Sequence, residues 1–275
     1  MLVTLNDILP RAAGSVSSVA CINVFGFEDA RAIIDAAEQL QSPVILATNK
    51  DMVDLLGVEA LAGLLRPMIE ASSASVCLHL DHCYEEKIVY QAMKAGYSSV
   101  MFDGSQLPLA ENIQRTRQVV KVAEAFGISV EGEIGSVPYE EGRDHIKSIF
   151  TDPTEAQQYA EDSGLDALAV AVGNIHRLTT PTCSIDYSLL SDIESNVTVP
   201  LVIHGTTGIP KTDIIKLKQT RVAKFNIGTS LRMVVGNNLR AAMAAEPEQF
   251  DRSYFMRKIQ PDIRTEAERI IQLLA

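Results

Sequence analysis

Short, nearly continuous runs of apolar residues recur along the chain and predict buried β-strands. Strands covered on both faces read as unbroken apolar runs, as in a parallel sheet, whereas a strand with one solvated face alternates apolar and polar positions. The runs span residues 18–24, 42–48, 75–81, 98–103, 127–133, 167–173, 200–204 and 221–227. We therefore expect a sheet that is buried on both sides.

Most of the segments between these runs have apolar residues at helical spacing. Residues 27–41 carry Ala30, Ile33, Ile34, Ala37 and Leu40 at positions that share one helix face. Similar patterns predict helices over residues 107–126, from Asp152 and Thr154 to Gly164, and after Pro210. Strands that alternate with helices in this way are typical of an α/β fold.

Eight strand–helix units favour a (β/α)8 TIM barrel. A doubly wound open sheet is the alternative, but it usually has a glycine-rich first turn, which residues 24–27 do not form. Residues 229–275 predict two or three extra C-terminal helices beyond the barrel. The chain has no Ser- or Gly-rich linker and no repeat, so we expect a single domain over residues 1–275.

Composition narrows the classes of partner. The 275-residue chain has a formal net charge of −11, which disfavours nucleic acid as a partner. Its apolar runs are shorter than the roughly 18–20 residues of a membrane helix, and its N-terminus lacks the pattern of a signal peptide. We expect a cytoplasmic protein with no membrane partner, whose four cysteines are reduced thiols.

Polar residues gather at the ends of the predicted strands. Active sites of TIM barrels lie at the C-terminal ends of the strands. Each of the following lies at or just beyond such an end: Asp81, His82, Asp103, Glu131, Glu133, His204 and Asn226, with His176 three residues past another. We expect these side chains to share one rim of the barrel.

Three of the five histidines follow different predicted strands: His82, His176 and His204. Imidazole nitrogen is a good zinc ligand, and a three-histidine site with an open fourth position is a catalytic arrangement. Asp81 would then stand beside the ion as a proton-transfer group. His79 is expected to pack inside a strand and His145 to be solvated. The alternative is that the three histidines are unrelated polar residues on the rim.

Five segments, in order, resemble the successive motifs of class II, metal-dependent fructose-bisphosphate and tagatose-bisphosphate aldolases. They are residues 78–83, 98–105, 130–135, 201–208 and 224–229, and the resemblance covers residues 1 to about 240. The short chain, and Gly228 where the fructose-type enzymes usually have Asp, place it nearer the tagatose-type branch.

The resemblance implies a barrel with one zinc ion per subunit, and it allows a monovalent cation, Na⁺ or K⁺. It implies reversible cleavage of a ketose (bis)phosphate or related phosphorylated keto sugar into dihydroxyacetone phosphate and an aldehyde. A homodimer or homotetramer is expected, with a sugar phosphate as the small-molecule partner.

The resemblance also assigns roles to residues of this chain. His82, His176 and His204 would hold the zinc ion, and Asp103 and Glu133 would match ligands of an alternate zinc position. Asp81 would be the acid/base at the aldehyde side, and Glu140 and Glu141 would handle the proton on the enediolate carbon. The substrate contacts would include Asn23, Arg177, Gly205, Thr206, Thr207, Asn226, Ile227, Gly228 and Thr229.

The chemistry fits these residues independently. A chelated metal stabilises the enediolate charge as a Lewis acid, and Asp81 can remove the hydroxyl proton. A Schiff-base lysine is then unnecessary, so we expect Lys224, on the last predicted strand, to be ion-paired in the barrel wall.

Departures from the family pattern cluster in the loops that contact substrate. Arg177 stands where the family has Gly, residues 136–138 lack a Gly pair, residues 47–49 lack Gln and Ser, and Thr206–Thr207 replaces Gly–Ser. Drift within the family is one interpretation. The other is a changed substrate, such as a deoxy, acidic or sulfonated sugar phosphate, with the Arg177 guanidinium binding an anionic group. A metal-dependent isomerase or epimerase, or a non-catalytic sugar-phosphate binder, are the remaining hypotheses.

Overall fold

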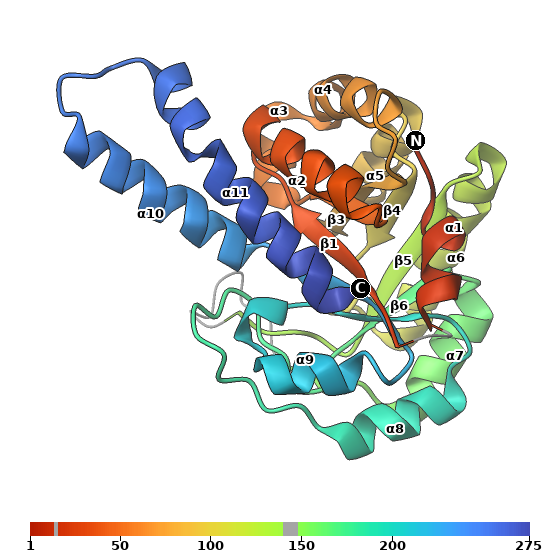
Figure 1. Ribbon diagram of the computed structural model, residues 1–275. Helices are drawn as coiled ribbons and strands as arrows, with labels where there is room; N and C mark the ends of the chain where they lie inside the picture. Colours follow the sequence, from red (N-terminus) through yellow and green to blue (C-terminus); the bar gives the residue numbers. More distant parts are fainter. Residues whose placement is uncertain (14–15, 140–147) are drawn as a thin grey trace.

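Eight parallel strands close into a barrel in the order β1 to β8 (Figure 1). The computed structural model describes residues 1–13, 16–139 and 148–275. The barrel closes because β1 pairs with β8 in parallel, with Val19 opposite Lys224 and Cys21 opposite Asn226. The strands are β1 Val19–Asn23, β2 Val44–Thr48, β3 Val76–Cys83, β4 Ser99–Phe102, β5 Ser129–Ile134, β6 Ala167–Val170, β7 Leu201–Ile203 and β8 Val222–Ile227. The predicted (β/α)8 TIM barrel is confirmed.

Helices alternate with the strands along the chain. They are α1 Leu5–Ala13, α2 Phe27–Leu40, α3 Lys50–Leu56, α4 Val58–Glu70, α5 Glu86–Ala95, α6 Leu109–Phe126, α7 Pro153–Ser163, α8 Tyr187–Asn196, α9 Lys211–Leu217, α10 Thr229–Ala245 and α11 Arg252–Leu274, with a 3₁₀ turn η2 at Thr206–Gly208. The predicted start of α7 is confirmed, since the Asp152 side chain accepts bonds from the backbone N–H groups of Thr154 and Glu155.

Two apolar layers hold the barrel together. The larger lies between the strands and the surrounding helices and includes Val44 and Leu46 of β2. The alternate residues of the same strand, Ile45 and Ala47, belong to a smaller cluster of mostly small side chains inside the barrel. Leu5 and Leu9 of α1 join that inner cluster, so α1 plugs the end of the barrel at which the strands begin.

Two predicted strand ends need correction. Strand β3 continues to Cys83, past a register irregularity between Leu80 and Cys83, so that Asp81 and His82 are still part of it. Glu131 is an interior residue of β5 and is fully buried. It was predicted at the rim, but the inward-facing positions of a strand alternate along its whole length, and Glu131 occupies a deeper one than Glu133.

The C-terminal segment forms two helices, α10 and α11, which project together from the barrel (Figure 1). The returning helix α11 packs along α2, where Arg252 pairs with Glu28 at 3.2 Å. Within the described residues, no helix is both long and apolar enough to cross a bilayer. All four cysteines are buried free thiols, as predicted.

Candidate active site

One pocket opens at the ends of the strands, where the sequence places most of its polar residues. Of the predicted site residues, it is lined by Asn23, Asp81, His82, His176, Arg177, His204, Gly205, Thr206, Thr207, Asn226, Gly228 and Thr229. Ile227 lies in the outer apolar layer and does not line it. Glu140, Glu141 and His145 lie outside the described residues.

The three predicted zinc ligands converge. The ring centroid of His82 lies 4.9 Å from that of His176 and 4.5 Å from that of His204. One nitrogen of each ring lies within 4.8 Å of the others. His82 has a left-handed backbone, with φ of 47°, which is uncommon for a residue other than glycine. The predicted meeting of three strand exits is therefore observed.

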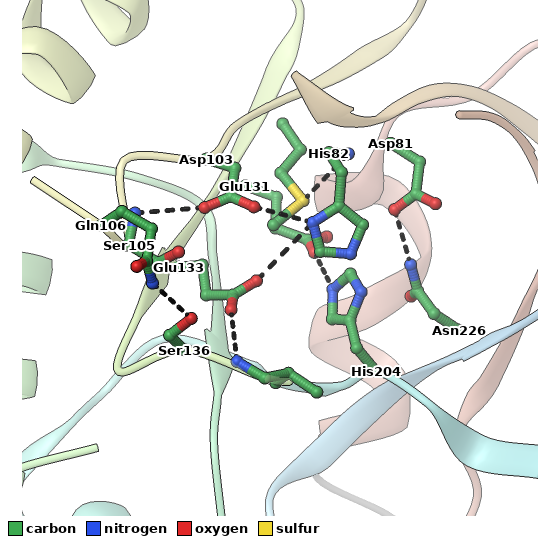
Figure 2. Close-up of polar contacts among 12 residues, drawn as sticks. Asp81, His82, Asp103, Ser105, Gln106, Glu131, Glu133, Ser136, His204 and Asn226 are labelled. Atoms are coloured by element: carbon green, nitrogen blue, oxygen red, sulfur yellow. Dashed lines mark hydrogen bonds and ion pairs between the residues drawn. The ribbon is translucent and has the colours of Figure 1, made fainter. Parts of the chain in front are cut away.

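Carboxylates fix two of these rings (Figure 2). Nδ1 of His82 lies 2.8 Å from Oδ2 of Asp103, and Nε2 of His204 lies 3.0 Å from Oε1 of Glu131. The opposite nitrogens, Nε2 of His82 and Nδ1 of His204, are buried without a hydrogen-bond partner among the described residues. Buried polar atoms are normally satisfied, and metal-binding histidines typically bond a carboxylate through their other nitrogen. The residues present therefore fit a zinc ion held by His82, His176 and His204.

A second set of possible ligands overlaps the first. His82, Asp103 and Glu133 also bring one ligand atom each to within 4.8 Å of the others. Burial and the neighbouring Asp103 carboxylate raise the pKa of Glu133 to about 8. Burial by itself would raise the pKa of Asp103 as well, but its hydrogen bond and attraction to His82 lower it. This geometry is compatible with the alternate metal position that the resemblance implies.

Asp81 lies beside the three imidazoles, buried and held by two amides. Its Oδ2 accepts from Nδ2 of Asn23 at 2.8 Å, and its Oδ1 accepts from Nδ2 of Asn226 at 2.9 Å. Burial by itself would raise the pKa of Asp81, but the basic side chains around it, which include His82 and the ammonium of Lys224, outweigh that effect and lower it far below its usual range. Asp81 is thus an ionised carboxylate that can accept a proton.

Below the pocket lies a fully buried ion pair. Nζ of Lys224 is 2.7 Å from Oε2 of Glu131 and donates to Oδ1 of Asn226 at 2.7 Å. Lys224 and Glu131 have no exposed surface. The expected ion-paired lysine in the barrel wall is confirmed. His79 is the packed histidine that was expected, with Nδ1 2.8 Å from Oγ of Ser99, and burial, aided by the charge of Lys224, lowers its pKa to about 3.

Two arginines lie near one another at the mouth of the pocket. Their guanidinium groups share one exposed carboxylate, since Oδ2 of Asp51 lies 3.0 Å from Nη2 of Arg177 and 3.5 Å from Nη2 of Arg232. Arg177 lies 5.3 Å from the ring centre of Tyr139, and Arg232 lies 4.3 Å from that of Phe25. Each guanidinium is therefore held against an aromatic ring.

Sequence reasoning selected Arg177 at this mouth but missed Asp51, Arg232 and Tyr139. A signal for Asp51 was present, because residues 49–51 directly follow a predicted strand on the same rim. Arg232 lies in the first turn of α10, directly after the last strand. The backbone of Arg177 is also left-handed, with φ of 62°. Arg177 therefore keeps the backbone conformation that glycine adopts easily, and adds a cationic side chain.

Two segments with closely packed glycines also line the pocket, one at Gly205 and one at Gly228. Gly205 has φ of 70°, and a Cβ atom there would meet the carbonyl oxygen of Ile175, so no other residue fits easily. A Cβ atom at Gly228 would lie 2.8 Å from Oδ1 of Asn23. The long helix α10 begins directly after Gly228, at Thr229. A helix N-terminus presents unpaired N–H groups that favour an anion.

Comparisons with known proteins agree with this geometry. A family model described as fructose-bisphosphate aldolase class-II matches residues 3–275. The crystal structure of the YdjI aldolase from Escherichia coli K12 superposes with a TM-score of 0.88 and 28% identity, covering 100% of this chain and 98% of that chain. A fructose-bisphosphate aldolase from Campylobacter jejuni shares the fold, with a TM-score of 0.84 and 21% identity over 99% and 95% of the two chains.

Proposed function

Because the chain belongs to the class II fructose-bisphosphate aldolase family, we propose that it is a zinc-dependent aldolase. It cleaves a phosphorylated ketose reversibly into dihydroxyacetone phosphate and an aldehyde. The observation that carries this proposal is the ionised Asp81 beside three converging imidazoles, two of which present buried nitrogens with no protein partner in the described ranges. A binding protein has no need of such a base beside a metal site.

His82, His176 and His204 would hold the zinc ion, which when bound polarises the substrate carbonyl as a Lewis acid. The protein sets up the ligands in advance. Asp103 orients His82 and Glu131 orients His204, so that the nitrogens facing the pocket carry lone pairs. Burial lowers the pKa of His176 and of His204, which favours the neutral form that binds metal.

Asp81 performs the proton transfer. It removes the proton from the hydroxyl on the carbon that becomes the aldehyde, and the oxygen electrons form the aldehyde C=O as the C–C bond from that carbon breaks. The electron pair of the broken bond stays on the other fragment, which then takes up a proton to become dihydroxyacetone phosphate. In the synthetic direction Asp81 returns the hydroxyl proton. The amides of Asn23 and Asn226 keep both carboxylate oxygens in place through this cycle.

The backbone on the far side of the pocket supports binding of the phosphate. Gly205, Thr206 and Thr207 form the tight turn after β7, and Gly228 and Thr229 begin α10. Their backbone N–H groups and hydroxyls can hold the phosphate of the dihydroxyacetone phosphate half, aided by the helix N-terminus.

The arginines at the mouth favour a substrate whose aldehyde half is anionic. Arg177 and Arg232 present two guanidinium groups against one carboxylate, Asp51, and guanidinium binds carboxylate, phosphate or sulfonate groups in bidentate fashion. We propose that this group is part of a non-standard sugar phosphate, because Arg177 itself is a departure from the family pattern.

The Arg177→Ala variant should raise KM about 10- to 100-fold for a substrate with an anionic aldehyde half, the effect of losing a hydrogen bond to a charged group. The KM for a substrate with a neutral aldehyde half should change little. Asp51→Asn should have the opposite effect on the anionic substrate, because it removes the competing carboxylate. Arg115→Ala is the matched control, since Arg115 pairs with Glu111 on the same helix, α6, and does not line the pocket. Undiminished turnover of fructose or tagatose bisphosphate by Arg177→Ala would contradict the assignment.

Product analysis tests the function itself. The zinc-loaded protein is incubated with a panel of ketose phosphates, deoxy-keto acid phosphates and sulfonated sugar phosphates, and the products are separated. We expect two carbonyl fragments, one of them dihydroxyacetone phosphate. A single isomeric product from every active substrate would instead indicate an isomerase or epimerase.

A further inference from the structure

The buried ammonium of Lys224 contacts both halves of the proposed catalytic apparatus without lining the pocket. We propose that Lys224 is a positioning residue that orients the proton-transfer group Asp81 through Asn226 and the metal ligand His204 through Glu131. The inference rests on the proposed function, because it assigns Asp81 and His204 those roles. It deepens that function by identifying one cation, inside the barrel, that sets up both.

The first contact decides which way the Asn226 amide faces. An ammonium group can only donate hydrogen bonds, so the atom of Asn226 that lies 2.7 Å from Nζ of Lys224 must be the amide oxygen. The amide nitrogen is then turned toward Asp81, whose Oδ1 it reaches at 2.9 Å. Without the ammonium, the Asn226 amide could rotate and present its oxygen to the carboxylate, which would repel it.

The second contact decides which nitrogen of His204 carries the proton. Lys224 binds Oε2 of Glu131 at 2.7 Å, which leaves Oε1 to accept from Nε2 of His204 at 3.0 Å. A proton on Nε2 leaves the lone pair on Nδ1, the buried nitrogen that faces the pocket. The ammonium holds the Glu131 carboxylate in place, and Glu131 in turn fixes the tautomer of His204 that binds metal.

A purely structural role explains the pair less well. Taking two charges out of water is costly, and replacing a buried ion pair with apolar side chains is often neutral or stabilising. The inner cluster around the pair includes small apolar side chains such as Ala167, Ala169 and Ala223, and Nε2 of the buried His79 lies 3.7 Å from Oε2 of Glu131. The need to orient polar groups explains why two charges are buried here, whereas packing alone does not explain it.

The decisive comparison uses Lys224→Met, which keeps an unbranched apolar stem, and the double variant Lys224→Met/Glu131→Gln. The single variant leaves the charge of Glu131 buried without its cation, so it should lower the thermal midpoint. The double variant removes both charges and should recover much of that loss.

In both variants, the zinc affinity, measured by competition with a chelator, should fall about 10- to 100-fold. The kcat should fall by a similar factor, as when other residues that orient metal ligands are lost. KM should stay within about twofold, because neither residue lines the pocket.

Ile45→Ala is the matched control, because Ile45 is a fully buried residue of the same inner cluster, on β2, and its side chain has no polar or charged group. It should lower the thermal midpoint without changing kcat or zinc affinity. If the double variant regains stability together with normal kcat and zinc affinity, Lys224 only balances a charge and the proposal is wrong. If both Lys224 variants fail to fold while Ile45→Ala folds, the role is structural and the proposal is equally wrong.

The zinc competition also separates this inference from the proposed function. A wild-type protein that binds zinc but cleaves none of the substrates would refute the aldolase assignment. The fall in zinc affinity of the Lys224 variants would still test the contact through Glu131 to His204.

Discussion

The Asp81→Ala variant should lose about 10²- to 10⁴-fold in kcat, the range that a positioned acid/base group contributes, and should still bind zinc. Asp81 is an ionised, buried carboxylate fixed between two amides, and its oxygens have no role in holding the three imidazoles. Removing it takes away the proton acceptor and leaves the proposed metal ligands intact. The measurements are kcat under saturating substrate and zinc content by elemental analysis.

Asp166→Asn is a matched control for this loss. Asp166 accepts bonds from the backbone N–H of Val130 and from the side chain of Asn6, at the end of the barrel opposite the pocket. Its replacement should affect stability and leave kcat unchanged. Turnover by Asp81→Ala within tenfold of the wild type, with zinc retained, would mean that another group transfers the proton.

His204→Ala should lose both zinc and turnover. The loss of the His204 ring removes one of the three proposed zinc ligands and leaves the buried Glu131 oxygen without its donor. We expect zinc affinity to fall by at least about 10- to 100-fold, the effect reported for weaker, outer contacts to a ligand, and activity to become undetectable at stoichiometric zinc. Zinc content and kcat are again the measurements, so that the pattern differs from that of Asp81→Ala.

Removing the metal from the wild-type protein also tests whether turnover depends on zinc. Dialysis against a chelator should abolish turnover, and added zinc should restore it while the thermal midpoint rises, because a ligand that binds only the folded state stabilises it. Full activity after the metal has been removed, verified by elemental analysis, would refute the assignment of His82, His176 and His204 as catalytic zinc ligands.

Much of the barrel was predictable because its strands are buried on both faces. Each of the eight predicted apolar runs contains one observed strand or most of it. The predicted end of β3, at Asp81, was two residues too early, since the strand continues to Cys83 through a register irregularity and the left-handed His82. Polarity ends an apolar run in the sequence, but a polar residue that faces the inside of a barrel does not end a strand.

The candidate site, like the barrel, was predictable from the sequence only in part. The three histidines and Asp81 were found because each follows an apolar run, and strand ends of a parallel barrel meet at one rim. The pairing of Arg177 with Asp51, by contrast, joins a loop to the first turn of α3, more than a hundred residues away in the sequence. No local pattern records that contact, because it depends on how the two segments are placed at the mouth of the pocket.

The amino-acid sequence by itself determined the barrel, the family motifs and the set of side chains at the strand ends, because these follow from local periodicity and from residue types at fixed spacing. Only the tertiary structure decided which atoms of those side chains meet. Closing β1 against β8 brings Lys224, Glu131 and Asn226 from two distant strands to hydrogen-bonding distance. Contacts of about 3 Å decide which nitrogen of a histidine is free and which way an amide faces, and those distances exist only after the barrel has closed.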